Sequence, residues 1–181
     1  MFFPRHPLLI FLIGARASGK SALGRLLAER LQLAFADTDR HIRIADGLEV
    51  AEFVARSGWP AFRARESAAL RECAQPRTVV ATGGGMALDP HNREFMRATG
   101  TVFFLDVPAR VLALRLAENP LAAQRPSLTG LPPAEESERV LAEREPIYRM
   151  AAHHAVNAAR PLPELVRELA DIISQNGSVA S

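Results

Sequence analysis

The sequence predicts an α/β protein built on a parallel sheet, and two observations support that fold class. Short apolar segments suited to strands alternate with helical patterns along the chain, as in parallel sheets with right-handed crossovers. Residues 14–21 read GARASGKS and fit G-x-x-x-x-G-K-[ST], the phosphate-binding P-loop. A continuous apolar run at 8–13 precedes this loop, and apolar residues at helical spacing follow it at 22–31, which is the context that the motif requires.

The remaining elements are expected to alternate after residue 31. Further strands are expected at residues 33–36, 78–81, 101–105 and 153–157. Further helices are expected at residues 40–45, 50–56, 59–73, 90–99, 109–116, 134–149 and 163–173. Pro60 suits a first helical turn, and Asp89 suits an N-cap. Residues 119–133 contain four prolines and lack an apolar period, so we expect a mobile loop there, and a frayed tail at 176–181.

Length and composition indicate one globular domain over residues 1–181. The net charge of +2 is too small to suggest a nucleic-acid-binding surface, and no apolar run approaches the ~18 residues of a membrane span. The single cysteine, Cys73, lies in an apolar helical pattern and is expected in the core rather than as a nucleophile. Residues 1–7 do not resemble a signal peptide, so we expect a cytoplasmic protein. We also expect a monomer without nucleic-acid or membrane partners.

The P-loop predicts nucleotide binding. Its two glycines allow the backbone to turn so that several N–H groups face inward, and these amides, with the N-terminus of the following helix, attract phosphate oxygens. Lys20, the only lysine of the chain, is expected to reach the β- and γ-phosphates, and the Ser21 hydroxyl to ligate Mg²⁺. The predicted nucleotide-binding residues are Gly14, Ala15, Arg16, Ala17, Ser18, Gly19, Lys20 and Ser21.

Three further clusters are expected at the carboxyl ends of strands, where parallel sheets bind ligands. Asp37 and Asp39 follow the strand at 33–36; one could support Mg²⁺ while the other meets an acceptor hydroxyl, or either could cap a helix. Three glycines after the strand at 78–81 could allow close approach to a ligand or form only a flexible turn. Three arginines make up the last cluster, and each by itself could be solvated surface. The glycines are Gly83, Gly84 and Gly85, and the arginines are Arg63, Arg125 and Arg144.

Together these motifs resemble shikimate kinase, the type II form in particular, over about residues 7–158. The matching stretches read GARASGKS, FADTD, FRARE, ATGGG, RPSLTG and REPIYR. The resemblance implies a three-layer P-loop kinase fold with a central five-stranded parallel sheet and a small mobile lid. It also implies transfer of the γ-phosphoryl group of ATP to the 3-hydroxyl of shikimate, with Mg²⁺, in aromatic amino-acid biosynthesis.

The resemblance also implies residue roles in phosphoryl transfer. Ser21 would ligate Mg²⁺, and Asp37 would hold it through water. Asp39 would hydrogen-bond the reacting hydroxyl and serve as its base. Lys20 and Arg125 would neutralise phosphate charge, with Arg125 in a lid over residues 117–131.

The same resemblance implies two substrate contacts. Arg63 and Arg144 would grip the shikimate carboxylate, whose planar shape suits the arginine fork, with the three glycines lining that pocket. Arg115 is similar to the arginine that packs against adenine. Residues 101–106 look like a Walker B strand, but the resemblance gives the metal role to Asp37, so Asp106 would merely end a strand.

Two other functions remain open from the sequence. Another small P-loop kinase, acting on a nucleoside monophosphate or a sugar acid such as gluconate, would share the phosphate site and differ in the acceptor pocket. A nucleotide-dependent binding module would have no acceptor chemistry. Substrate profiling separates the first, and failure to turn over ATP with any small alcohol would favour the second.

Overall fold

The computed structural model describes residues 8–118 and 130–178 of the chain. Its sheet is fully parallel, in the strand order β2-β3-β1-β4-β5. The strands are β1 (Leu9–Ile13), β2 (Ala34–Asp37), β3 (Thr78–Ala81), β4 (Thr101–Asp106) and β5 (His154–Asn157). The expected parallel α/β sheet of five strands is therefore confirmed, each strand lying within a residue or two of its predicted position.

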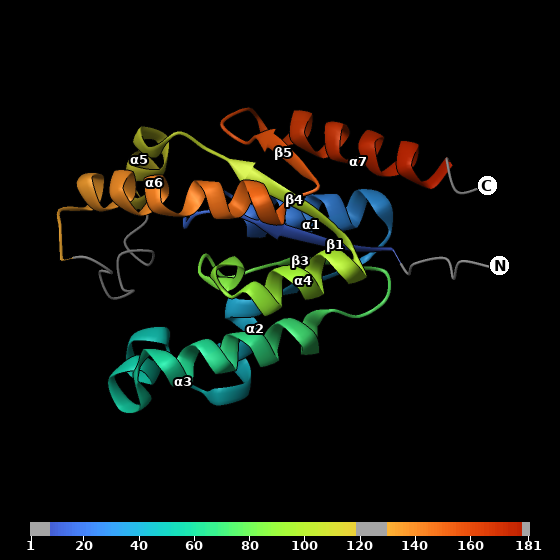
Figure 1. Cartoon of the computed structure of the whole chain (residues 1–181). Coiled ribbons are helices and arrows are strands. Elements are labelled where there is room, and N and C mark those ends of the chain that lie inside the picture. The colour runs from blue at the N-terminus through green and yellow to red at the C-terminus, as the bar shows by residue number, and fades with distance from the viewer. Residues whose placement is uncertain (1–7, 119–129, 179–181) are drawn as a thin grey trace.

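Helices cover both faces of the sheet (Figure 1). On one face α1 packs beside α7 and contacts β1, β2 and β3, while α4 and α6 contact β4 on the other. The helices are α1 (Lys20–Leu31), α2 (Thr38–Asp46), α3 (Val50–Cys73), α4 (Pro90–Thr99), α5 (Ala109–Glu118), α6 (Pro133–Ala151) and α7 (Leu162–Ser178), with a 3₁₀ turn, η1 (Met86–Leu88).

The core lies between these layers. Every residue of β1 and β3 is buried, as are the four central residues of β4, because helices cover both sides of these central strands. Cys73 belongs to this core and is 5% exposed, as expected for a structural cysteine.

A second, smaller core lies between α2 and α3. Ile42 of α2 is buried there against Phe62 and Ala69 of α3. Within α3, Gly58 adopts φ 79° and ψ 166°, a backbone conformation that is essentially restricted to glycine. Helical structure resumes at Trp59 and Pro60. The expected interruption between residues 56 and 59 is therefore present as a kink at Gly58, within one helix rather than between two separate helices.

The main differences from the expected elements lie at helix ends. α2 begins at Thr38, two residues before the predicted start, because Asp37 caps it. η1 was not predicted, and α7 continues to Ser178, past residue 176, where fraying was expected. The expected lid at 117–131 falls largely outside the described residues. Within the described parts of the chain, no helix has the length and apolar character to cross a membrane.

Candidate active site

The P-loop curls between β1 and α1 at the centre of the sheet. Gly14 has φ 146° and Gly19 has φ 94°, both in the region that favours glycine. Lys20 is 9% exposed, and its Nζ donates to the carbonyls of Gly14 at 3.0 Å and Ala15 at 2.7 Å, and to Ser18 Oγ at 3.3 Å. The loop is thus wrapped around the ammonium group, which lies beside the first turn of α1.

Asp37 ends β2 and faces the P-loop. Its Oδ2 accepts a 2.5 Å hydrogen bond from Ser21 Oγ, and its Oδ1 accepts from Arg40 N at 3.0 Å. The helix-cap interpretation of this carboxylate is therefore confirmed. The same group also lies against the P-loop hydroxyl, and its metal role stays a prediction. Sheet order explains the second contact, because β2 and β1 both flank β3 and all three strands run in the same direction.

Asp39, in the first turn of α2, lies over the glycine turn that follows β3. A Cβ added at Gly83 would stand 2.8 Å from Asp39 Oδ1 and 3.0 Å from Glu66 Oε1. The Gly83 amide donates to Thr38 Oγ1 at 2.9 Å. A larger residue at position 83 would thus have to displace two carboxylates that come from different helices.

Arg63 occupies the neighbouring position over Gly85. A Cβ at Gly85 would collide with the guanidinium group of Arg63. Arg63 forms an ion pair with Glu66, a carboxylate that is only 3% exposed, and its Cζ lies 5.1 Å from the centre of the Trp59 ring. The guanidinium group is therefore held in place by a buried carboxylate and an aromatic face.

Arg144 approaches the same turn from α6. Its Nη1 lies 3.5 Å from the Gly84 carbonyl oxygen, and the hydroxyl of Tyr148, one turn later, donates to that oxygen at 2.6 Å. Tyr148 is buried and stacks on Phe104 of β4. Burial raises the pKa of the Tyr148 hydroxyl, although the nearby Arg144 opposes the shift, so at neutral pH the phenol is protonated and donates.

Two cavities open around these residues and share Arg16, Val50 and Gly84 in their walls. The larger, of about 570 Å³, is lined by the P-loop residues Lys20 and Ser21 together with Asp37 and Asp39. The smaller, of about 100 Å³, is lined by both arginines, Arg63 and Arg144, by Glu66, and by an apolar wall from α3, α5 and α6. A cavity beside the P-loop therefore adjoins one lined by two cationic groups.

Arg115 of α5 lines the larger cavity. Its Nη1 donates to the carbonyl of Ala17 at 3.3 Å, and its Nη2 to the carbonyl of Ala158, just after β5, also at 3.3 Å. Asp106 lies away from both cavities, where it pairs with Arg149 at 2.5 Å. Asp106 thus has a cationic partner at the end of β4, and its expected lack of a metal role stays a prediction.

Arg125 lies outside the described residues, so its role stays a prediction. Sequence reasoning missed two residues that shape the site, Glu66 and Tyr148. Each could have been found from helical spacing: Glu66 stands three positions after Arg63, and Tyr148 four positions after Arg144, so each shares a helix face with its arginine.

Comparison with known proteins identifies the family. The sequence profile described as shikimate kinase matches residues 16–174. The chain belongs to the shikimate kinase family. It is 54% identical over 160 residues to shikimate kinase 2 of Dickeya chrysanthemi, covering 88% of this chain and 92% of that protein. A solved shikimate kinase from Acinetobacter baumannii, in complex with shikimate, superposes with a TM-score of 0.86 at 30% identity, covering 94% of this chain and 96% of that one.

Family membership confirms the predicted P-loop kinase fold and the predicted activity, ATP-dependent phosphorylation of a shikimate hydroxyl. A gluconokinase structure from Sinorhizobium meliloti also superposes, with a TM-score of 0.56 at 22% identity, covering 94% of each chain. That likeness shows the fold alone. The shikimate kinase assignment thus prevails over the gluconate kinase alternative that the P-loop had left open.

Proposed function

We propose that this shikimate kinase transfers the γ-phosphoryl group of ATP to the 3-hydroxyl of shikimate across the junction of the two cavities. The observation that carries the proposal is their shared wall at Arg16 and Gly84. ATP phosphates would occupy the P-loop side and the acceptor would occupy the arginine side. The reacting hydroxyl would then lie at the junction, beside Asp39.

On the nucleotide side, the P-loop amides and Lys20 would hold the phosphates, and Arg115 would pack against the adenine. The hydroxyl of Ser21 and the carboxylate of Asp37 fit Mg²⁺, which prefers hard oxygen ligands and is commonly held by one or two protein groups together with phosphates and water. Among the described residues, no group of three or more Asp, Glu, His or Cys side chains is arranged so that it could hold a metal ion. Ser21 and Asp37 would therefore hold Mg²⁺ together with phosphate and water. When bound, Mg²⁺ neutralises charge on the β- and γ-phosphates.

At the junction, Asp39 would accept a hydrogen bond from the 3-hydroxyl and take its proton as the oxygen attacks the γ-phosphorus. A bond forms between that oxygen and phosphorus, the bond to the β–γ bridging oxygen breaks, and ADP leaves. Phosphoryl transfer depends mainly on position and charge neutralisation. Lys20 would supply positive charge from this chain, and Arg125 is proposed to add more.

On the acceptor side, Arg63 and Arg144 would grip the shikimate carboxylate, with the glycine turn at 83–85 lining the pocket. Glu66 supports this role, because its buried carboxylate holds the Arg63 guanidinium over Gly85. Arg144 lies beside Gly84 of the same turn. Two planar cations next to one backbone turn are suited to a single carboxylate.

A coupled ADP-release assay tests the proposal. ADP release should require shikimate, with gluconate and nucleoside monophosphates giving only the background rate, and the product should carry phosphate on the 3-oxygen by phosphorus–proton NMR correlation. Phosphorylation at another hydroxyl, or equal rates with gluconate, would contradict the proposed acceptor geometry.

We further propose that the enzyme works as a cytoplasmic monomer on small-molecule substrates, without nucleic-acid or membrane partners. The net charge of +2 over 181 residues supports the absence of nucleic-acid and membrane partners, since it gives little electrostatic attraction to polyanions. Light scattering coupled to size exclusion should give a mass near 19.7 kDa; a dimer mass would contradict the proposal.

A further inference from the structure

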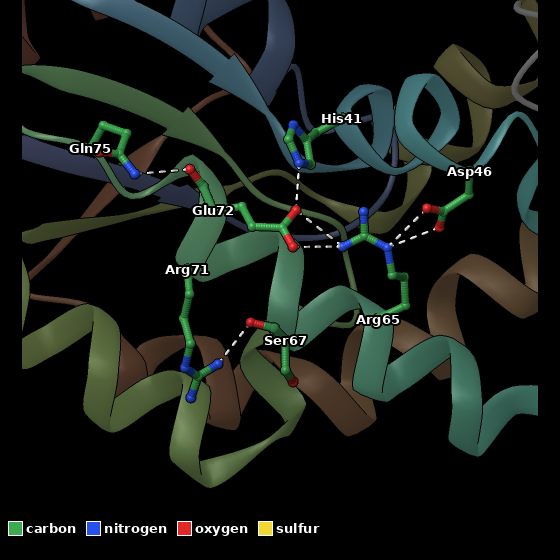
Figure 2. A network of polar contacts seen from close by, with 7 residues as sticks. All are labelled: His41, Asp46, Arg65, Ser67, Arg71, Glu72 and Gln75. Atoms are coloured by element: carbon green, nitrogen blue, oxygen red, sulfur yellow. Dashed lines mark hydrogen bonds and ion pairs between the residues drawn. The ribbon is translucent and has the colours of Figure 1, made fainter.

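A network of polar contacts joins α2 to α3 outside the two cavities (Figure 2). Arg65 Nε donates to both carboxylate oxygens of Asp46, at 2.9 and 3.2 Å, and its Nη1 donates to both oxygens of Glu72, at 3.2 and 3.3 Å. His41 Nε2 lies 2.6 Å from Glu72 Oε2. The side chains of Arg65 and Asp46 are only 18% and 22% exposed, so this part of the network is largely withdrawn from water.

The contacts hold α2 at its middle and at its C-terminal end. His41 is the fourth of the nine residues of α2 and Asp46 is its last, while Arg65 and Glu72 are seven positions apart on α3. The hydrogen bond with His41, together with Arg65, lowers the pKa of the Glu72 carboxyl, so Glu72 remains charged at neutral pH. α2 therefore cannot slide or rotate on α3 without breaking a polar contact at its middle or at its C-terminal end.

The same two helices carry three of the residues around the proposed acceptor site. Asp39 comes from α2, whereas Arg63 and Glu66 come from α3. Asp39 and Glu66 converge over Gly83, where a Cβ would stand 2.8 and 3.0 Å from their oxygens. Between the helices lies the small core of Ile42, Phe62 and Ala69, separate from the main core, and apolar contact alone is non-directional.

We propose that Arg65 and Glu72 are positioning residues for the acceptor: by holding α2 in register on α3, they set the separation between the carboxylate that meets the reacting hydroxyl, Asp39, and the cation that grips the acceptor, Arg63. This inference rests on the proposed roles of those two residues. Small displacements of reacting groups are costly in catalysis. Loss of the network should therefore weaken acceptor binding while the protein still folds.

The test compares Arg65→Met and Glu72→Gln with a control, Arg139→Met, which removes an exposed ion pair with Glu143 on α6. Both network variants should raise the shikimate KM by about three- to tenfold, towards the lower end of the coupling between contacting residues. The KM for ATP should stay within about twofold of wild type, as should all constants of the control. Arg65→Lys should recover only part of the loss, because one ammonium group cannot hold two carboxylates bidentately.

A double variant separates positioning from stabilisation. In an Arg63→Ala background, Arg65→Met should raise the shikimate KM less than it does alone, because part of the arrangement that it maintains is already gone. A lowered melting temperature with an unchanged shikimate KM, or additive effects of the two substitutions, would overturn the inference and leave a purely structural network. If Arg65→Met does not fold, the near-isosteric Glu72→Gln decides in the same way. A wild type without shikimate-dependent turnover would instead contradict the proposed function.

Discussion

Lys20 illustrates how single side chains carry this site. Its ammonium group donates three hydrogen bonds to groups of the P-loop itself, which hold the loop in its curled shape. Asp37 likewise has two partners, one on α2 and one on the P-loop. Both residues therefore have structural contacts as well as proposed roles in catalysis, and substitutions can measure each contribution.

Replacing Lys20 by Ala or Arg should lower kcat by about 100-fold or more, the cost of removing one preorganised charge-stabilising donor. Arginine fails because its planar fork cannot occupy the position of a compact ammonium enclosed by three acceptors. The coupled assay measures turnover, and circular dichroism checks folding. Near-normal turnover of Lys20→Arg would contradict this role of Lys20.

Asp37 and Asp106 form a matched pair for the metal role. Asp37→Asn should raise the Mg²⁺ concentration needed for half-maximal turnover and lower kcat, because an amide ligates hard cations less well than a carboxylate. Asp106→Asn should change either value little, since Asp106 pairs with Arg149 away from the cavities. Turnover across a Mg²⁺ titration measures both, and the reverse ranking would assign the metal to β4.

Gly85→Ala should imitate loss of Arg63. The backbone at Gly85, with φ −96° and ψ −6°, accepts alanine, but the new Cβ must displace the Arg63 guanidinium. Loss of that charge-assisted contact to the carboxylate costs about 1.5–3 kcal/mol, or roughly 10- to 150-fold in the shikimate KM.

The Gly85→Ala/Arg63→Ala double variant provides the control. It should bind shikimate no worse than Arg63→Ala alone, and the ATP KM should stay constant throughout. Additive losses would mean that Gly85 acts independently of Arg63. An acceptor analogue without the carboxylate should be nearly insensitive to either substitution.

Among the elements, α3 has the most unusual construction. Gly58 interrupts its helical conformation, and Pro60, which donates no backbone hydrogen bond, follows at the first turn of the second segment. This break turns Trp59 and Phe62 toward the small core and toward Arg63. The first segment brings Val50 into the walls of both cavities. The kink therefore allows one helix to contribute to two sides of the site.

Gly58→Ala should lower the free energy of unfolding by about 1–3 kcal/mol, because alanine is strained at this backbone conformation. Urea denaturation measures the change, and Ser57→Ala, at the exposed neighbouring position, is the control. Equal stability of the two variants would mean that α3 straightens at no cost.

At the scale of the whole molecule, the main core joins the sheet to the helices of both faces, and Cys73 reports on its integrity. Burial is the main reason that the pKa of the Cys73 thiol rises to about 11. Since the thiolate is the reactive form, both low accessibility and low thiolate content protect this group in the folded protein.

Cys73 should therefore react with an aromatic disulfide reagent at pH 8 only through unfolding. Labelling should be slow in the native protein and accelerate with urea in parallel with the unfolding transition. Absorbance of the released thiolate measures the rate, and Cys73→Ser, which lacks the only thiol of the chain, gives the baseline. Rapid labelling of the native protein would show that α3 opens locally at its C-terminal end.

The sequence by itself determined the P-loop, the five strands and most of the helices, because each depends on residues that are neighbours in the chain. GARASGKS is one continuous segment, the strands are apolar runs, and Asp89 caps α4 two residues away, through His91 N. Such signals are local and survive without knowledge of the fold. The family motifs are also continuous segments, and they supplied the predicted acceptor-site residues.

Only the tertiary structure decided which of these residues meet. Ser21 and Asp37 are 16 positions apart, and Tyr148 and Gly84 are 64 apart. The choice between Asp37 and Asp106 as the carboxylate beside the P-loop also depended on strand order and on Arg149. These contacts follow from the parallel alignment of β2, β3 and β1 and from the packing of α6 over the glycine turn. Side chains distant in the chain are brought together by burial of apolar faces, which is non-directional, so no local pattern specifies their final distances.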